Sequence, residues 1–169
     1  MIIIEQEQVE QDTLTERTEE QNILTKALQI AQEAARAAGE SLCKKQGHEK
    51  VLYKKTCKDY LLDADIEAES IIINKLKAHF PHYDILSEET PQESQQSPYQ
   101  WIVDPLDGSF NFQHRSPVYG VSIGLRVHNH IQVAVVYLPS YDEMFTAIRG
   151  QGAYLNGEPI KVSTVTDLV

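Results

Sequence analysis

Residues 101–112 read Trp-Ile-Val-Asp-Pro-Leu-Asp-Gly-Ser-Phe-Asn-Phe and carry the most informative pattern in the chain. The apolar residues at the start of this stretch predict a buried strand that ends at Asp104. Pro105 fixes one backbone angle, so a tight turn directs the side chain of Asp107 to the same side as that of Asp104. Gly108 has no Cβ and allows close approach to the backbone. The sequence therefore predicts two carboxylates presented together on one turn.

The chemistry of this turn suits a cation and an anion side by side. Two carboxylates with exposed backbone carbonyls are typical ligands of hard cations such as Mg²⁺. If residues 108–113 begin a helix, its free N–H groups form an anion site beside the cation. Upstream, Glu88 and Glu89 follow a short predicted strand, and Asp65 stands at a predicted helix start. Convergence of these ends would hold a phosphate ester between metal ions and a helix terminus.

The elements around the turn predict an α+β fold, with two N-terminal helices packed on an antiparallel β-sheet. Helical periodicity covers residues 19–42, with Gly39 as a point of interruption, and residues 66–79, with Asp65 as the expected cap. Residues 52–62 fit either a short hairpin or a loop. Strands are predicted at 84–87, 100–103, 118–127, 131–138, 144–148 and 160–162, the last one after a tight turn at Asn156-Gly157.

Length and composition fit one globular domain. The chain has 169 residues, of which 41% are hydrophobic and 24% charged. Residues 1–17 are rich in Gln, Glu and Thr and are expected to be a flexible extension, while residues 18–169 form the metal-binding α+β domain. No apolar run is long enough for a membrane span, and the start lacks the pattern of a secretory signal. With Cys43 and Cys57 as the only thiols, a disulfide scaffold is excluded and a cytoplasmic location is expected.

Charge is distributed unevenly. The formal net charge is -10, and residues 59–107 hold eleven acids against two bases. Such a segment either stays solvated or collects cations. The acidity argues against sequence-independent nucleic-acid binding, which needs a basic face. Neither a nucleic acid nor a membrane is therefore expected as a partner.

Together these motifs resemble those of the inositol monophosphatase family, which are magnesium-dependent, lithium-sensitive phosphatases. The resemblance extends from about residue 25 to residue 164 and implies the N-terminal half of the layered fold of that family, with the second α/β half absent. Besides the turn itself, the matching blocks are residues 54–65, Asp65-x-x-x-Glu69, Phe80-Pro81, Ile85-Leu86-Ser87-Glu88-Glu89, Val121-Ser122-Ile123-Gly124, Val135-Val136-Tyr137, Gly150-x-Gly152-Ala153 and Asn156-Gly157.

The resemblance implies a site for two Mg²⁺ ions. Glu88 would bind metal on the side of the attacking water, and Asp104 would bridge the two ions. Leu106 would contribute its backbone carbonyl, and Asp107 would hold the ion that faces the leaving oxygen. In such a site one ion makes hydroxide available near neutral pH and the other neutralises the leaving alkoxide.

The resemblance also implies the catalytic and substrate-binding residues. The Ser109 hydroxyl, paired with Asp65, would orient or deprotonate the attacking water, and Glu88 would act with them. Gly108 and Ser109 would donate backbone N–H groups to the phosphate. The residues expected to border the substrate are Glu88, Leu106, Asp107, Gly108 and Ser109.

The expected function is that of a magnesium-dependent phosphomonoester hydrolase and homodimer, acting on a small phosphorylated alcohol such as myo-inositol 1-phosphate. The segment Asn111-Phe112-x-His114 favours inositol phosphates. A 3′(2′),5′-bisphosphate nucleotidase and a histidinol phosphatase remain open alternatives, because residues that read the leaving group lie mostly in the half that the chain lacks.

Several departures from the family pattern keep simpler readings open. Leu62 and Ala64 stand where threonines are usual, and Ser109 replaces a threonine. The Trp-Asp-x-x-Ala-Gly motif, whose aspartate completes the second metal site, is missing from the sequence. A truncated, non-catalytic metal-binding or assembly domain is therefore an alternative, as is an acidic structural protein. Two local alternatives correspond to these readings. In the first, Asp104 and Asp107 are only turn residues; in the second, Asp65 is only a helix cap.

Overall fold

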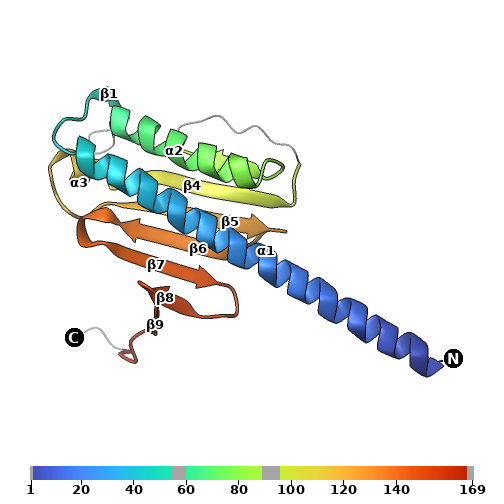
Figure 1. The fold of residues 1–169 in the computed structure, drawn as a ribbon. Helices are drawn as coiled ribbons and strands as arrows, with labels where there is room; N and C mark the ends of the chain where they lie inside the picture. Colours follow the sequence, from blue (N-terminus) through green and yellow to red (C-terminus); the bar gives the residue numbers. More distant parts are fainter. Residues whose placement is uncertain (1, 55–59, 89–95, 167–169) are drawn as a thin grey trace.

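Two helices lie across one face of a β-sheet in the computed structural model of the chain (Figure 1). The structure describes residues 2–54, 60–88 and 96–166. The helices on the sheet are α1 (Ile2–Lys45) and α2 (Asp63–His79), and a small two-stranded sheet of β1 (Val51–Lys54) and β2 (Tyr60–Leu62) connects them. The antiparallel pairing of these two strands agrees with the hairpin alternative for the described part of residues 52–62, while residues 55–59 lie outside the described residues. The seven strands of the main sheet lie in the order β3 (Asp84–Ser87), β4 (Tyr99–Asp107), β5 (Gly120–Val127), β6 (His130–Leu138), β7 (Glu143–Ile148), β8 (Ala153–Leu155) and β9 (Glu158–Ile160).

The direction of β3 corrects the expected antiparallel sheet. From β4 to β9 each strand pairs antiparallel with the next, but β3 and β4 run parallel, with Ser87 opposite Val103. A parallel neighbour requires the chain to return to the end where it started, and residues 88–98 provide the length for that return. The sheet is therefore mixed, and the carboxyl ends of β3 and β4 lie at the same edge.

The core lies between the helices and the sheet. Val121, Ile123 and Leu125 alternate along β5 and are buried beneath α1, whereas Ser122 and Gly124 face the opposite side and are partly exposed, as the alternation predicts. Alanines of α1 are fully buried, so the helix axis comes close to the sheet. The α+β expectation is confirmed, and the second helix packs against α1 and, within the main sheet, against β4.

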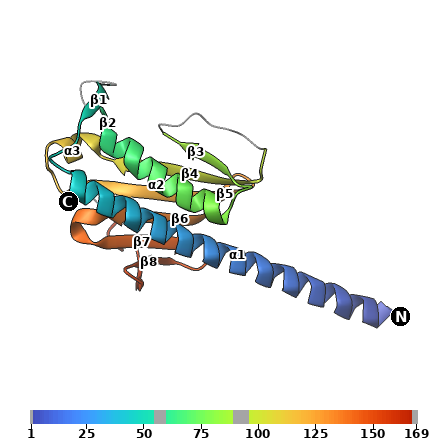
Figure 2. The same cartoon turned by 45° about the horizontal axis from the view of Figure 1, so that its top comes forward.

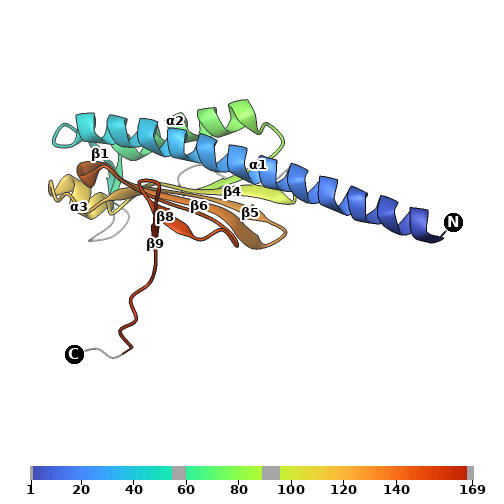
Figure 3. The same ribbon diagram turned by 60° about the horizontal axis from the view of Figure 1, so that its bottom comes forward.

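Several element boundaries differ from the sequence expectation, among them the end of β4, which continues beyond residue 103 to Asp107. The helix expected at 19–42 begins at Ile2, and its first part projects beyond the sheet (Figure 3). The flexibility expected for residues 1–17 stays a prediction. The second helix begins at Asp63, so Asp65 is its third residue and not the N-cap; its carboxylate instead accepts the backbone N–H of the N-cap residue, Leu62. The return strand β9 begins earlier than predicted, because Asn156 and Gly157, with φ of +50° and +85°, make the whole turn.

The β1–β2 hairpin, the start of α2 and the short helix α3 (Ser109–Gln113) gather at one end of the molecule (Figure 2). Strand β2 contacts both helices, which places the beginning of α2 near the segment that follows β4. Among the described residues, no helix combines the length and the apolar character that a membrane span requires.

Helix α1 crosses β6 at Gly39 without interruption, contrary to the expectation of a break there. A Cβ at this position would lie 2.6 Å from Cε1 of Tyr137 and 2.8 Å from Cγ of Pro139. The tyrosine ring is held in place, because its hydroxyl donates to Asp142 at 3.0 Å and the Arg36 guanidinium lies 5.2 Å from its centre. Glycine is therefore required by the close packing of helix on sheet.

We predict that Gly39→Ala destabilises the fold by about 1–3 kcal/mol, the usual cost of overpacking a fixed core. This loss occurs although alanine favours a helix interior by about 1 kcal/mol over glycine. Gly124→Ala is the matched control, since its Cβ would meet Val133 and Ile131 only at 3.7 and 3.8 Å, and its stability should stay close to wild type. Urea denaturation measures both; equal stability of Gly39→Ala and wild type would contradict the packing argument.

Candidate active site

Glu88 directly follows β3, and Asp104 lies within β4, three residues before that strand ends at Asp107. The pairing of Ser87 with Val103 brings the following residues, Glu88 and Asp104, to adjacent positions of the same register. Glu88 is exposed and Asp104 is half-buried. Backbones of paired strands lie about 4.8 Å apart, so the two acids begin from neighbouring points of the main chain. Glu89, the other acid predicted here, lies outside the described residues.

The tight turn predicted after Asp104 is instead an irregularity within β4, because the strand continues to Asp107. The Asp104 carboxylate accepts a hydrogen bond from the backbone N–H of Leu106 at 3.2 Å. The pairing of β4 with β5 is irregular between Asp104 and Asp107, and Asp107 is exposed at the end of the strand. Two carboxylates and the Leu106 carbonyl therefore come from four consecutive residues.

Gly108 starts α3 with a φ of +87°, in the left-handed region. A Cβ there would also lie 3.1 Å from the carbonyl oxygen of Val118, which the Asn111 side-chain amide contacts at 2.8 Å. Backbone conformation and close approach therefore both require glycine at this position. Ser109 follows as the first residue of α3, as predicted.

Asp65 lies on the side of α2 that faces the core. Its side chain is 4% exposed, and one carboxylate oxygen accepts the backbone N–H of Leu62 at 2.9 Å. Glu69, one turn later on the same side, is also 4% exposed. Burial of two acids at the start of a helix goes beyond what capping requires, because a cap can be satisfied at the surface.

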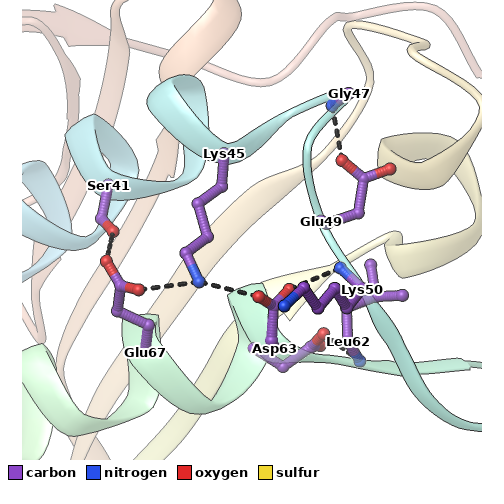
Figure 4. Close-up of polar contacts among 9 residues, drawn as sticks. Ser41, Lys45, Gly47, Glu49, Lys50, Leu62, Asp63 and Glu67 are labelled. Carbon is purple, nitrogen blue, oxygen red and sulfur yellow. Dashed lines mark hydrogen bonds and ion pairs between the residues drawn. The ribbon is translucent and has the colours of Figure 1, made fainter.

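On the outer side of the same turn, an ion-pair network joins α2 to the end of α1 (Figure 4). Lys45 Nζ lies 3.0 Å from Asp63 and 2.8 Å from Glu67. The Asp63 carboxylate also accepts the Lys50 backbone N–H at 2.7 Å, and Glu67 accepts the Ser41 hydroxyl at 2.6 Å. The sequence analysis missed this network, although acids four residues apart on a helix signal a shared partner.

The contacts of this network shift the pKa of each charged member. Bonding to the Lys50 N–H, with help from Lys45, lowers the pKa of Asp63. Lys45 and then Ser41 lower the pKa of Glu67. Glu67 and then Asp63 raise the pKa of Lys45. All three groups therefore hold their charges more firmly than they would alone.

The predicted donors fit a hard cation in their chemistry. Within residues 2–54, 60–88 and 96–166, no three His, Cys, Asp or Glu side chains are placed to hold a metal ion by themselves. The predicted set, however, combines the carboxylates of Glu88, Asp104 and Asp107 with the Leu106 carbonyl, and all are oxygen donors of the kind that Mg²⁺ prefers. The assignment of these residues as metal ligands stays a prediction.

Several known proteins are similar to this chain. Inositol monophosphatase 1 of Solanum lycopersicum is 43% identical over 150 residues, which are 86% of this chain and 55% of the relative. Nus factor SuhB of Escherichia coli K12 is 40% identical over 144 residues, covering 83% of this chain and 54% of that protein. The chain spans about half the length of the curated relatives it matches.

Solved structures show the same relationship. The suhB protein of Bartonella henselae matches with a TM-score of 0.79 and 38% identity, covering 82% of this chain and 55% of the other. An inositol monophosphatase of Anabaena (Nostoc) sp. PCC 7120 matches with a TM-score of 0.74 and 38% identity. The match covers 85% of this chain and 52% of that protein. The sequence model of the inositol monophosphatase family matches residues 23–169. This chain is thus a member of the inositol monophosphatase family.

Proposed function

We propose that the chain provides the metal-binding half of a magnesium-dependent phosphomonoester hydrolase. The observation that supports this most directly is the parallel register of β3 and β4, whose last pair, Ser87 and Val103, directly precedes Glu88 and Asp104, while β4 continues to Asp107 and Gly108 follows it. The substrate would be a small phosphorylated alcohol, with myo-inositol 1-phosphate as the first candidate. A cytoplasmic location and a homodimeric state belong to the same proposal.

In this mechanism Glu88, Asp104, Asp107 and the Leu106 carbonyl would hold Mg²⁺. When bound, Mg²⁺ would make water more acidic near neutral pH and would neutralise charge on the leaving oxygen. The acids of this turn would otherwise repel a phosphate monoester, since like charges about 4 Å apart interact unfavourably even in water.

The remaining residues would bind phosphate and position water. The backbone N–H groups of Gly108 and Ser109 would donate to phosphate oxygens, and the absence of a Cβ at Gly108 lets an anion approach the main chain. The Ser109 hydroxyl would orient the attacking water and pass its proton toward the Asp65 carboxylate. Burial of Asp65 supports this role, because a carboxylate shielded from water holds a fixed direction.

A second candidate is the non-catalytic binding or assembly function that the sequence leaves open. One relative, 40% identical to this chain, carries the name Nus factor SuhB instead of the name of a phosphatase. A chain that binds a protein partner without turning over phosphate esters would fit the alternative of an assembly domain. Phosphate release distinguishes the two candidates.

A substrate panel tests the main proposal. With Mg²⁺, we expect the chain to release phosphate from myo-inositol 1-phosphate faster than from adenosine 3′,5′-bisphosphate or histidinol phosphate, and a chelator should stop the reaction. Preference for the bisphosphate would replace the inositol assignment. If none of the three esters releases phosphate with Mg²⁺, the hydrolase proposal fails for this polypeptide and the binding function is favoured.

Asp104→Asn tests the metal site. We expect the variant to lose turnover and to lose the rise in melting temperature that Mg²⁺ gives the wild type, as ligand binding to the folded state requires. Without metal, its stability should match or exceed wild type, because one of several repelling carboxylates is removed. Glu158→Gln removes an exposed acid on β9 and should keep the Mg²⁺ response. Differential scanning calorimetry measures these melting temperatures. If Mg²⁺ does not raise the melting temperature of the wild type, the result argues against the metal site.

Gly108→Ala tests the close approach at the start of α3. The matched control is Gly157→Ala, since Gly157 has a φ of +85° but no atom within 4 Å of its Cβ. Both variants should lose about 1–2 kcal/mol from the left-handed backbone. Gly108→Ala should lose more stability than Gly157→Ala, because its Cβ would also press against the Val118 carbonyl oxygen. It should in addition weaken the inhibition of the enzyme by inorganic phosphate. Equal losses in urea denaturation with unchanged inhibition would contradict the argument.

A further inference from the structure

The start of α2 carries two pairs of acids that point in different directions. Asp65 and Glu69 form the inner pair, and both are 4% exposed. Asp63 and Glu67 form the outer pair, with side chains that are 27% and 47% exposed. Each pair is spaced by four residues, so its members lie on one side of the helix, where their like charges repel. The repulsion within the outer pair must therefore be compensated if the first turns of α2 are to hold the inner pair in its buried position.

All four carboxylate oxygens of the outer pair have a donor (Figure 4). The two Asp63 oxygens accept from the Lys50 N–H and from Lys45 Nζ. The two Glu67 oxygens accept from the Ser41 hydroxyl and pair with Lys45 Nζ. Lys45 is the member that contacts both acids, and it belongs to the last turn of α1. The outer side of α2 is therefore attached at two successive turns to one ammonium group.

Attachment at two turns fixes the rotation of the helix about its axis. Neighbouring residues of an α-helix are about 100° apart around the axis, so Asp65 points about 200° away from Asp63. A rotation that separated Asp63 from Lys45 would turn Asp65 by the same angle. Leu62 is the N-cap of α2 and also the last residue of β2, where it pairs with Val51, so a rotation of the helix against that strand would strain the 2.9 Å bond from the Leu62 N–H to Asp65.

We propose that Lys45 is a positioning residue, which fixes the rotation of the first turn of α2 and thereby the direction of the Asp65 carboxylate. The proposal rests on the proposed function in one respect, the role of Asp65 in orienting water. Lys45 itself contacts Asp63 and Glu67 and acts through them. Its effect on the site depends on the positive charge and on the length of the side chain. Arginine at this position should therefore preserve the effect, and methionine should abolish it.

The chain offers a matched control at the far end of the same two helices. Lys75 of α2 pairs with Glu33 of α1 at 2.9 Å, and the two side chains are 32% and 43% exposed. This pair also joins α1 to α2, with similar exposure to the Lys45 network. Lys75→Met should therefore cost similar stability while leaving the first turn of α2 in place.

Amide hydrogen exchange on the full-length chain tests the positioning directly. In Lys45→Met, the Leu62 amide should exchange about five to ten times faster relative to core amides, the effect of losing about one hydrogen bond. Lys75→Met should leave it within about twofold of wild type, and Lys45→Arg should restore protection. Glu67→Gln, which removes one charged partner, serves as a second variant if Lys45→Met does not fold. Unchanged Leu62 protection in the variant that folds overturns the proposal.

Kinetics test the consequence for the reaction. Lys45→Met should lower kcat about tenfold and change KM less than about twofold, since orientation of water contributes to the transition state more than to binding. On an Asp65→Ala background, the same substitution should have no further effect on kcat. A full additional loss there would show that Lys45 acts without Asp65. If the wild type releases no phosphate, the proposed function fails, and the exchange experiment still decides the positioning role.

Discussion

The candidate site depends on the parallel pairing of β3 with β4. An antiparallel β3 would place Glu88 at the opposite end of the sheet from Asp104, and no local rearrangement would bring them together. In the parallel register the two strands run toward the same edge, and β4 continues past Asp104 through an irregularity to Leu106 and Asp107. One pairing direction thus directs acids from separate segments toward the same edge, where carboxylates brought close together would repel one another and would favour a cation.

The helices hold this arrangement from one side. Gly39 and the buried alanines let α1 lie close to β5 and β6, and α2 then fits beside it over β4. This packing brings the start of α2 to the end of the molecule that carries α3 (Figure 2). A buried acid on α2 can face the strand ends only if the depth and rotation of that helix are set. The close contacts at Gly39 set the depth, and the ion pairs at Lys45 set the rotation.

Local signals predicted most of the fold. The alternation along β5, the Asn156-Gly157 turn and the glycine that starts α3 each leave a pattern within a few residues, and each is found in the structure. The direction of β3 leaves no such pattern, because a short strand has the same residue preferences in parallel and antiparallel pairs. The interruption expected at Gly39 was wrong for a related reason: the Tyr137 ring that requires glycine lies almost a hundred residues away in the chain, and helix propensity does not include it.

The acids of the site were predictable as residues, but their surroundings were not. Asp65 has the residue type of a helix cap, and burial distinguishes it from one. Asp63 and Glu67 have the same type and lie within two residues of Asp65, yet both contact the Lys45 ammonium and have a lowered pKa. An acid already paired with a fixed ammonium gains less from a metal ion than one bonded to backbone N–H groups, since the ammonium already neutralises its charge. This difference separates the outer acids of α2, which join the helices, from Asp104 and Asp65, whose carboxylates accept backbone N–H groups.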